Sequence, residues 1–143
     1  MKRYLLAFFI VVGSLGLKAQ WVSIPDANFA TYLQATFPSC MNGSLMDTTC
    51  PAIVNATGVF CLSRNISNLT GIQYFDNLDT LHCQVNKITI LPALANTIRV
   101  LYCSDNLLTG LPSLPNSLTY LVCGDNSQLS SLPALPSGLT YLD

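Results

Sequence analysis

Residues 78–143 read LDTLHCQVNKITILPALANT (78–97), IRVLYCSDNLLTGLPSLPNS (98–117), LTYLVCGDNSQLSSLPALPSG (118–138) and LTYLD (139–143), which are successive copies of one pattern. The copies start at Leu78, Ile98, Leu118 and Leu139, so the period is 20 or 21 residues. Such a period is typical of proteins in which each copy forms one turn of a stack. A single copy cannot bury its apolar side alone, so we expect the whole stack to be the folding unit.

Each copy carries the pattern LxxLxC, and we expect its third to seventh residues to form a short parallel strand. Side chains alternate between the two faces of a strand, so one leucine and one cysteine of each copy point inward. These inward positions are Leu81, Leu101, Leu121, Leu142, Cys83, Cys103 and Cys123. The leucines at and after the LP steps should close the core from the other side of each turn: Leu91, Leu94, Leu111, Leu114, Leu132 and Leu135.

An asparagine and a cysteine recur at fixed positions, and we interpret both columns as structural. An asparagine side chain offers a donor and an acceptor where the backbone leaves the strand, so Asn86, Asn106 and Asn126 can form a ladder between turns. The cysteine column should consist of small buried apolar side chains: Cys61, Cys83, Cys103 and Cys123. Zinc binding is the alternative, but the chain has no CxxC pair and one histidine, so we predict no metal site.

Residues 20–55 are predicted to form an N-terminal cap that covers the first apolar layer of the stack. Pro25 and Asp26 are typical of the first turn of a helix. Apolar residues at three- and four-residue spacing predict that this helix spans about residues 25–37: Phe29, Tyr32, Leu33 and Phe37. The remaining cysteines, Cys40 and Cys50, lie in a loop rich in Gly, Asn, Ser and Thr, and in an exported chain they favour a disulfide.

Residues 56–143 contain the repeats: one atypical copy, two or three full ones, and a last copy that is cut off. The atypical copy over 56–77 matches the next one at an offset of 22 residues, at Val59, Cys61, Ile66 and Leu69. Arg64 stands where the later copies have asparagine. The segment 70–75 lacks proline, and we expect a short helical turn there, whereas the LP segments should be extended.

The repeat LxxLxCxxNxLxxLPxLPxx resembles the leucine-rich repeat in its short bacterial form. The segment IPDANFATYL (24–33) resembles the IPDxNFxxYL opening that precedes such repeats in secreted and surface proteins of bacteria, including internalin-like ones. The resemblance implies an α/β solenoid. Its short parallel strands would form a concave face, extended or short helical segments a convex face, and a helix the N-terminal cap. The usual activity of this family is to present the concave surface to another macromolecule.

Residues 1–19 begin with Lys2 and Arg3, continue with an apolar run and end at Ala19, as a secretory signal peptide does. The apolar run is too short for a membrane span, so we predict a secreted or cell-surface protein with no span in its mature chain. Without these residues the chain keeps three basic residues against seven aspartates, a net charge of −4. Three scattered cations argue against nucleic acid as a partner.

The outward-facing positions of the strands are the systematic candidates for a binding site. They combine aromatic and small side chains, which suit contact with a protein or a glycan. The candidates are Thr80, His82, Gln84, Val100, Tyr102, Ser104, Tyr120, Val122 and Tyr141, with Gly124 and Asp143 at the equivalent places. Asp105 and Asp125 should add an acidic edge. The alternative is that the tyrosines only shield the sheet.

We find no catalytic constellation, phosphate loop or cofactor motif, so we predict a non-catalytic binding module for an unknown protein or glycan, used in adhesion or in recognition at a cell surface. The alternative is an N-terminal fragment whose repeats are the targeting scaffold of a missing effector or enzymatic domain. The last layer of the stack should expose Leu135, Leu139 and Leu142 and favour self-association.

Overall fold

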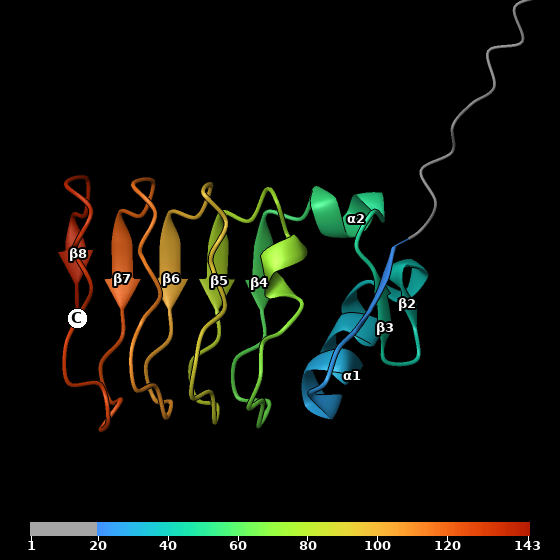
Figure 1. The fold of residues 1–143 in the computed structure, drawn as a ribbon, viewed down its shortest axis with the longest axis horizontal. Coiled ribbons are helices and arrows are strands. Elements are labelled where there is room, and N and C mark those ends of the chain that lie inside the picture. Colours follow the sequence, from blue (N-terminus) through green and yellow to red (C-terminus); the bar gives the residue numbers. More distant parts are fainter. Residues whose placement is uncertain (1–19) are drawn as a thin grey trace, which may run out of the picture.

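The computed structural model describes residues 20–143, and the predicted signal peptide lies outside this range. Figure 1 shows a small N-terminal unit beside a row of turns that runs to the C-terminus. The N-terminal unit contains β1 (Trp21–Ser23), α1 (Ala27–Thr36), η1 (Pro38–Cys40), β2 (Met41–Asn42), β3 (Leu45–Asp47) and α2 (Pro51–Val54). The row of turns contains β4 (Gly58–Phe60), η2 (Ile72–Tyr74), β5 (Thr80–His82), β6 (Val100–Tyr102), β7 (Tyr120–Val122) and β8 (Tyr141–Leu142).

Helix α1 is shorter than the helix predicted over residues 25–37, because its ends are set by capping. Asp26 has an extended backbone, and its side chain accepts hydrogen bonds from the amides of Asn28 and Phe29, so the helix starts after it. Pro38 disfavours a helical conformation of the residue before it, and Phe37 accordingly leaves the helix at φ −127°. The buried face of α1 consists of the apolar residues Phe29, Ala30, Tyr32 and Leu33.

The rest of the N-terminal unit is held by a small sheet and one covalent bond. Strand β3 lies between β1 and β2, and both pairs are antiparallel. A disulfide joins Cys40 to Cys50, as predicted, with their Cα atoms 5.6 Å apart. This bond ties the end of the 3-10 turn after α1 to the residue that precedes α2, and so closes the loop that leads into the repeats.

The five strands β4 to β8 form one parallel sheet in sequence order. Their register is regular, since Leu81 lies opposite Val59 on one side and Leu101 on the other. We predicted strands of five residues, but β5, β6 and β7 have three, although the ladder continues to Cys83, whose amide donates to the carbonyl of Tyr102. The chain then turns through a left-handed residue such as Val85, two positions after Cys83.

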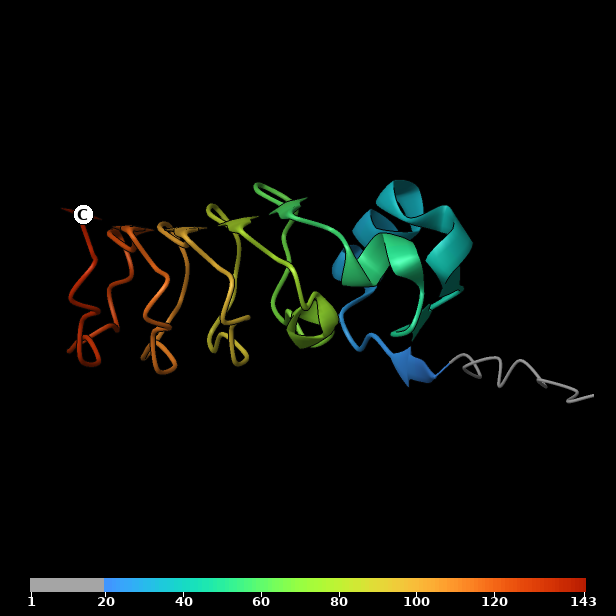
Figure 2. The ribbon, with the colours of Figure 1, turned by 90° about the horizontal axis from the view of Figure 1, so that it is seen from above.

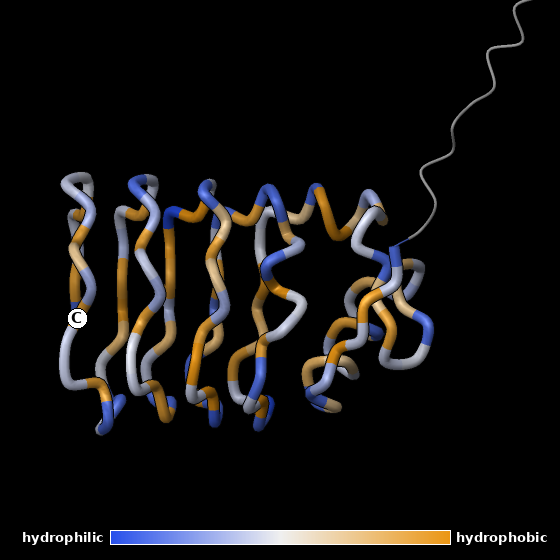
Figure 3. Tube along the Cα trace, in the orientation of Figure 1, coloured by the Kyte–Doolittle hydropathy of each residue, from blue (hydrophilic) through white to orange (hydrophobic). Residues whose placement is uncertain are grey.

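The return segments run on the side opposite the sheet, as Figure 2 shows. The LP segments are irregular and extended, while the first repeat has the 3-10 turn η2 within the segment 70–75, where a short helical turn was predicted. Figure 3 shows apolar segments recurring at corresponding places from one turn to the next. The repeat length thus brings equivalent residues into register through the stack.

The core is continuous from the N-terminal unit through the repeats. The inward leucines Leu81, Leu101 and Leu121 and the cysteines between them are buried. Two of the leucines predicted to close the core do not do so, because Leu132 and Leu135 are 37% and 45% exposed. Leu142, predicted to point inward, is also exposed, since within the described chain no further turn packs against the side of β8 away from β7.

The asparagine side chains bridge consecutive turns. Asn106 Oδ1 accepts from the amide of Ile88 in the preceding turn (3.0 Å), and Asn106 Nδ2 donates to the carbonyl of Cys83 in that turn (3.0 Å) and to two carbonyls of its own turn. Asn86 and Asn126 make the equivalent contacts. One side chain in each turn therefore satisfies backbone groups on both sides of a junction, which is what the buried backbone requires.

Candidate functional site

The outer face of the parallel sheet carries two rows of side chains, because the first and third residues of each strand point the same way. The first row consists of Gly58, Thr80, Val100, Tyr120 and Tyr141. The second row consists of Phe60, His82, Tyr102 and Val122. Most of these side chains are partly exposed, which leaves the face available for contact.

The aromatic rings on this face form one continuous row across all five strands. The ring centroid of His82 lies 5.2 Å from that of Phe60 and 4.3 Å from that of Tyr102. Tyr102 lies 5.3 Å from Tyr120, and Tyr120 stacks on Tyr141 at 4.3 Å with an interplanar angle of 6°. The aromatic residues on β4 to β6 are third residues of their strands, whereas those on β7 and β8 are first residues. The aromatic row therefore changes position between β6 and β7, where Tyr120 is in register with Val100 and not with Tyr102.

Phe60 is the member of this aromatic row that the sequence reasoning missed. The residue is 52% exposed, more than Tyr141 at the other end of the row. The signal was present, because the offset of 22 residues that relates Val59 to Leu81 also relates Phe60 to His82. The same offset therefore places an aromatic residue at the outward position of the first repeat.

The aromatic row is electrically neutral. Burial lowers the pKa of His82 below its ordinary value, which favours the neutral imidazole near pH 7. The neighbouring Tyr102 hydroxyl, burial and Tyr141 together raise the pKa of Tyr120 to about 12, so this phenol stays protonated. The row therefore offers flat apolar surfaces with hydroxyl and imidazole groups at their edges, and no fixed charge.

The remaining predicted site residues lie after the ends of the strands and not on the outer face of the sheet. Gln84 and Ser104 are half-buried beside the turn, and the amide nitrogen of Gln84 lies 3.5 Å from Nδ1 of His82. Asp105 and Asp125 are exposed, and their backbones are left-handed, with φ of 51° and 53°. Aspartate tolerates this conformation well, so the turn gives these two residues a structural reason in addition to the acidic edge that we predicted.

The cysteine column lies beneath the sheet with no disulfide among its members. Burial raises the pKa of Cys61 and of Cys103 to about 12, and it raises the pKa of Cys83 as well. These groups are thus protonated thiols at neutral pH, and the thiolate is the form that attacks electrophiles and binds metals. Within residues 20–143 no group of three His, Cys, Asp or Glu side chains is arranged to hold a metal ion.

A helix able to cross a membrane would have to be long and apolar, and no helix in the described part of the chain meets that condition. The longest, α1, has 10 residues.

The sequence matches no known protein-family model and no curated protein. Among solved structures, the functional domain of InlJ from Listeria monocytogenes, which includes a cysteine ladder, is similar over 89% of this chain and 29% of its own length, with 31% identity and a TM-score of 0.70. The leucine-rich repeat domain of a Shigella effector is similar over 63% of this chain and 40% of its own, with 33% identity and a TM-score of 0.59. An internalin of L. monocytogenes, InlF, matches 83% of this chain and 43% of its own, with 18% identity and a TM-score of 0.61.

The chain therefore has a leucine-rich-repeat-like fold and resembles bacterial leucine-rich repeat proteins. It spans less than half the length of each of these three structures.

Proposed function

We propose that this chain is an exported, non-catalytic binding module that uses the outer face of its parallel sheet to bind another protein at a cell surface. The observation that carries the proposal is the aromatic row from Phe60 to Tyr141. Aromatic side chains are enriched at the centres of protein interfaces, because they bury a large area with few rotatable bonds. The similarity to internalins and to an effector repeat domain supports a role in macromolecular contact.

The neutrality of the row favours a partner surface of matching character. A neutral patch gains its binding energy from buried apolar area and edge hydrogen bonds, and gains little from charge steering. Exposed aspartates, Asp105 and Asp125, stand beyond the ends of β6 and β7 and would disfavour an acidic partner at that rim. We therefore expect binding that depends weakly on salt concentration.

The test compares proteins captured from intact cell surfaces by the wild type and by a double variant, Tyr102→Thr with Tyr120→Thr. Threonine occupies the position equivalent to Tyr120 at residue 80, and its high strand propensity suits Tyr102 as well, so the strands should tolerate both replacements. The matched control is Ile90→Thr, an exposed apolar residue in a return segment. We expect partners retained by the wild type and the control to be lost from the double variant. Equal recovery by all three would refute the sheet-face proposal.

A second candidate is that the repeats are the targeting part of a longer effector. The similarity to the repeat domain of a Shigella effector, of which this chain spans 40%, favours it. The test is to read the gene on both sides of the segment that encodes these residues. An open reading frame that continues into a catalytic domain would support this candidate, and a stop codon directly after Asp143 would contradict it.

A further inference from the structure

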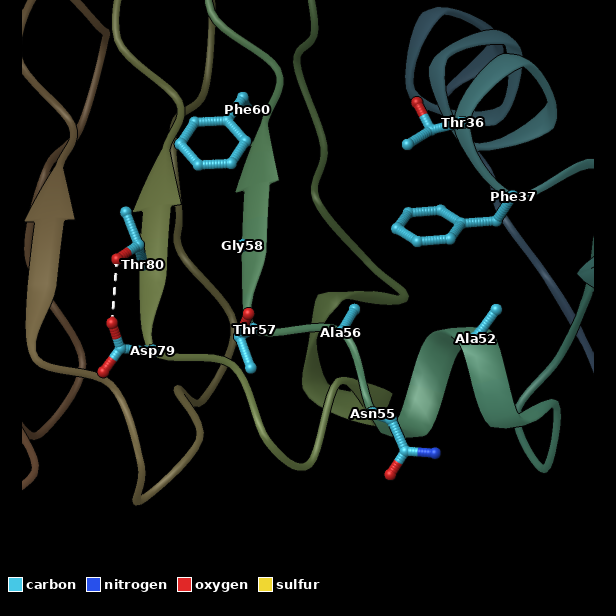
Figure 4. A pocket seen from close by; sticks show the side chains of 10 residues that line it. All are labelled: Thr36, Phe37, Ala52, Asn55, Ala56, Thr57, Gly58, Phe60, Asp79 and Thr80. Carbon is cyan, nitrogen blue, oxygen red and sulfur yellow. Dashed lines mark hydrogen bonds between the residues drawn. The ribbon is translucent and has the colours of Figure 1, made fainter.

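A second candidate site lies where the N-terminal unit meets the first strand, away from the middle of the aromatic row. It is an open hollow of about 570 Å³ between the end of α1, α2 and β4. Ligand sites for small molecules typically measure ~300–1,000 Å³, so this hollow is large enough. Figure 4 shows Phe37 reaching from the end of α1 toward β4, with Phe60 on the opposite side and Ala52 and Ala56 below the two rings.

The ring of Phe60 occupies space that is free only because the residue two positions before it, Gly58, has no side chain. A Cβ atom at Gly58 would lie 2.6 Å from Cε2 of Phe60, so the ring lies directly against the glycine. The floor of the hollow also contains Ala52 and Ala56. Small residues below and an exposed ring above leave a planar aromatic surface open to a ligand.

Two polar side chains, those of Asn55 and Thr57, lie at the lower edge of the hollow in Figure 4 and have unused hydrogen-bonding groups. Within the described chain, the side chains of Asn55 and Thr57 make no hydrogen bond. A second hollow of about 580 Å³ shares Asn55, Thr57 and Asp79 with the first and extends it toward Arg99. Asp79 is paired with Arg99, so the groove as a whole carries no net charge.

We propose that this groove binds a neutral oligosaccharide. A pyranose ring has a C–H face that packs on an aromatic ring and an equatorial edge of hydroxyl groups that need both donors and acceptors. The groove supplies the ring of Phe60 for the face, and the amide of Asn55 and the hydroxyl of Thr57 for the edge. Its electroneutrality favours an uncharged sugar over a sialylated or phosphorylated one. The groove shares Phe60 with the aromatic row but adds Asn55 and Thr57, which lie outside it, so variants that change only one of the two sites tell this inference apart from the sheet-face proposal.

The test is an NMR titration of residues 20–143 with four neutral tetrasaccharides, namely cellotetraose, maltotetraose, mannotetraose and chitotetraose, and with hexaproline as the peptide probe. We expect saturable shifts of the Asn55, Thr57 and Gly58 amides with at least one sugar. Phe60→Leu, which keeps an apolar side chain without a ring, should weaken that affinity about tenfold, and Phe60→Tyr should restore it.

Two further variants separate this groove from the aromatic row. Gly58 does not have a positive φ, so alanine fits its backbone conformation. The variant Gly58→Ala should therefore fold normally, but its Cβ should displace the Phe60 ring and weaken sugar binding. Tyr120→Thr, at the far part of the row, should bind sugar like the wild type. The proposal is overturned if no sugar gives saturable shifts, if the shifts centre on Tyr120 and Tyr141, if Phe60→Leu binds as well as the wild type, or if only hexaproline binds.

Discussion

The junction between the N-terminal unit and the first repeat can be compared with the junctions between later repeats. Between later repeats, the asparagine of one turn reaches back to the turn before it, as Asn106 does to Ile88 and Cys83. The first repeat has Arg64 in place of this asparagine, and its guanidinium lies 5.1 Å above the ring of Tyr32 in α1. At this junction the bridging side chain belongs to the N-terminal unit: Asp26 Oδ2 accepts hydrogen bonds from the amide and the hydroxyl of Ser67 in the first repeat, both at 2.8 Å.

The difference follows from which backbone groups each junction leaves unpaired. Asn106 makes one bond as an acceptor and three as a donor, which only an amide can do. Asp26 acts as an acceptor only, for amides of α1 through Oδ1 and for Ser67 and Asn68 through Oδ2. Five donor groups and no carbonyl face Asp26, and a carboxylate, which can only accept hydrogen bonds, matches such a set. The repeat junctions are therefore neutral, whereas the junction with the N-terminal unit is charged.

The largest effect should come from breaking the charged junction. Asp26→Ala removes the cap of α1, worth ~1 kcal/mol, and leaves the partly buried amides of Ser67 and Asn68 without their charged acceptor, worth ~1.5–3 kcal/mol. We expect the free energy of unfolding in urea to fall by ~3 kcal/mol. The matched control is Asp47→Ala, whose side chain accepts from the amide and the hydroxyl of Thr49, two residues away. A loss for Asp26→Ala no larger than for Asp47→Ala would contradict the bridging role.

The charged junction should also be sensitive to acid. Burial alone would raise the pKa of Asp26, but bonds from Ser67, Phe29 and Asn68 outweigh it and hold this pKa below its ordinary value. A carboxyl whose pKa is lower in the folded state contributes stability above its unfolded pKa of ~3.9, and this contribution is lost as the pH falls through the folded value. Unfolding measured from pH 6 downward should thus show less acid loss in Asp26→Asn than in the wild type. Parallel curves would count against this linkage.

The neutral junction should respond with a smaller loss. Asn106→Leu leaves the amide of Ile88 and carbonyls such as that of Cys83 without partners, which should cost ~2 kcal/mol in the free energy of unfolding. Lys87→Leu introduces the same side chain at an exposed position of the preceding turn and should change stability by less than ~0.5 kcal/mol. Thermal unfolding of both variants measures the contrast. An unchanged midpoint for Asn106→Leu would remove the ladder as a source of stability.

These junctions differ in how far the sequence could predict them. The asparagine column was predictable, because its members recur at a fixed offset and each pairs backbone groups of its own turn and of the turn before it. Asp26 was recognised only as favourable at a helix start, since its contacts with Ser67 and Asn68 span more than 40 residues and have no periodic signal. The groove beside Phe60 joins α1, α2 and β4 and was not predicted for the same reason. Periodicity predicts contacts between copies, but not contacts between a copy and a unit that occurs once.

The smallest effect concerns the turn that the repeats have in common. Its left-handed residue is Ser63, Val85, Asp105 or Asp125, and Val85 has φ of 57°. A β-branched side chain is strained in this conformation by ~1 kcal/mol, whereas aspartate or asparagine is tolerated. Val85 is also 49% exposed, so little packing is lost on replacing it. Val85→Asp should therefore raise the free energy of unfolding by ~0.5–1 kcal/mol, while Ile90→Asp, at a more exposed position without a left-handed backbone, should not. Equal changes in urea unfolding for the two variants would show that the gain comes from removing exposed apolar surface and not from the turn.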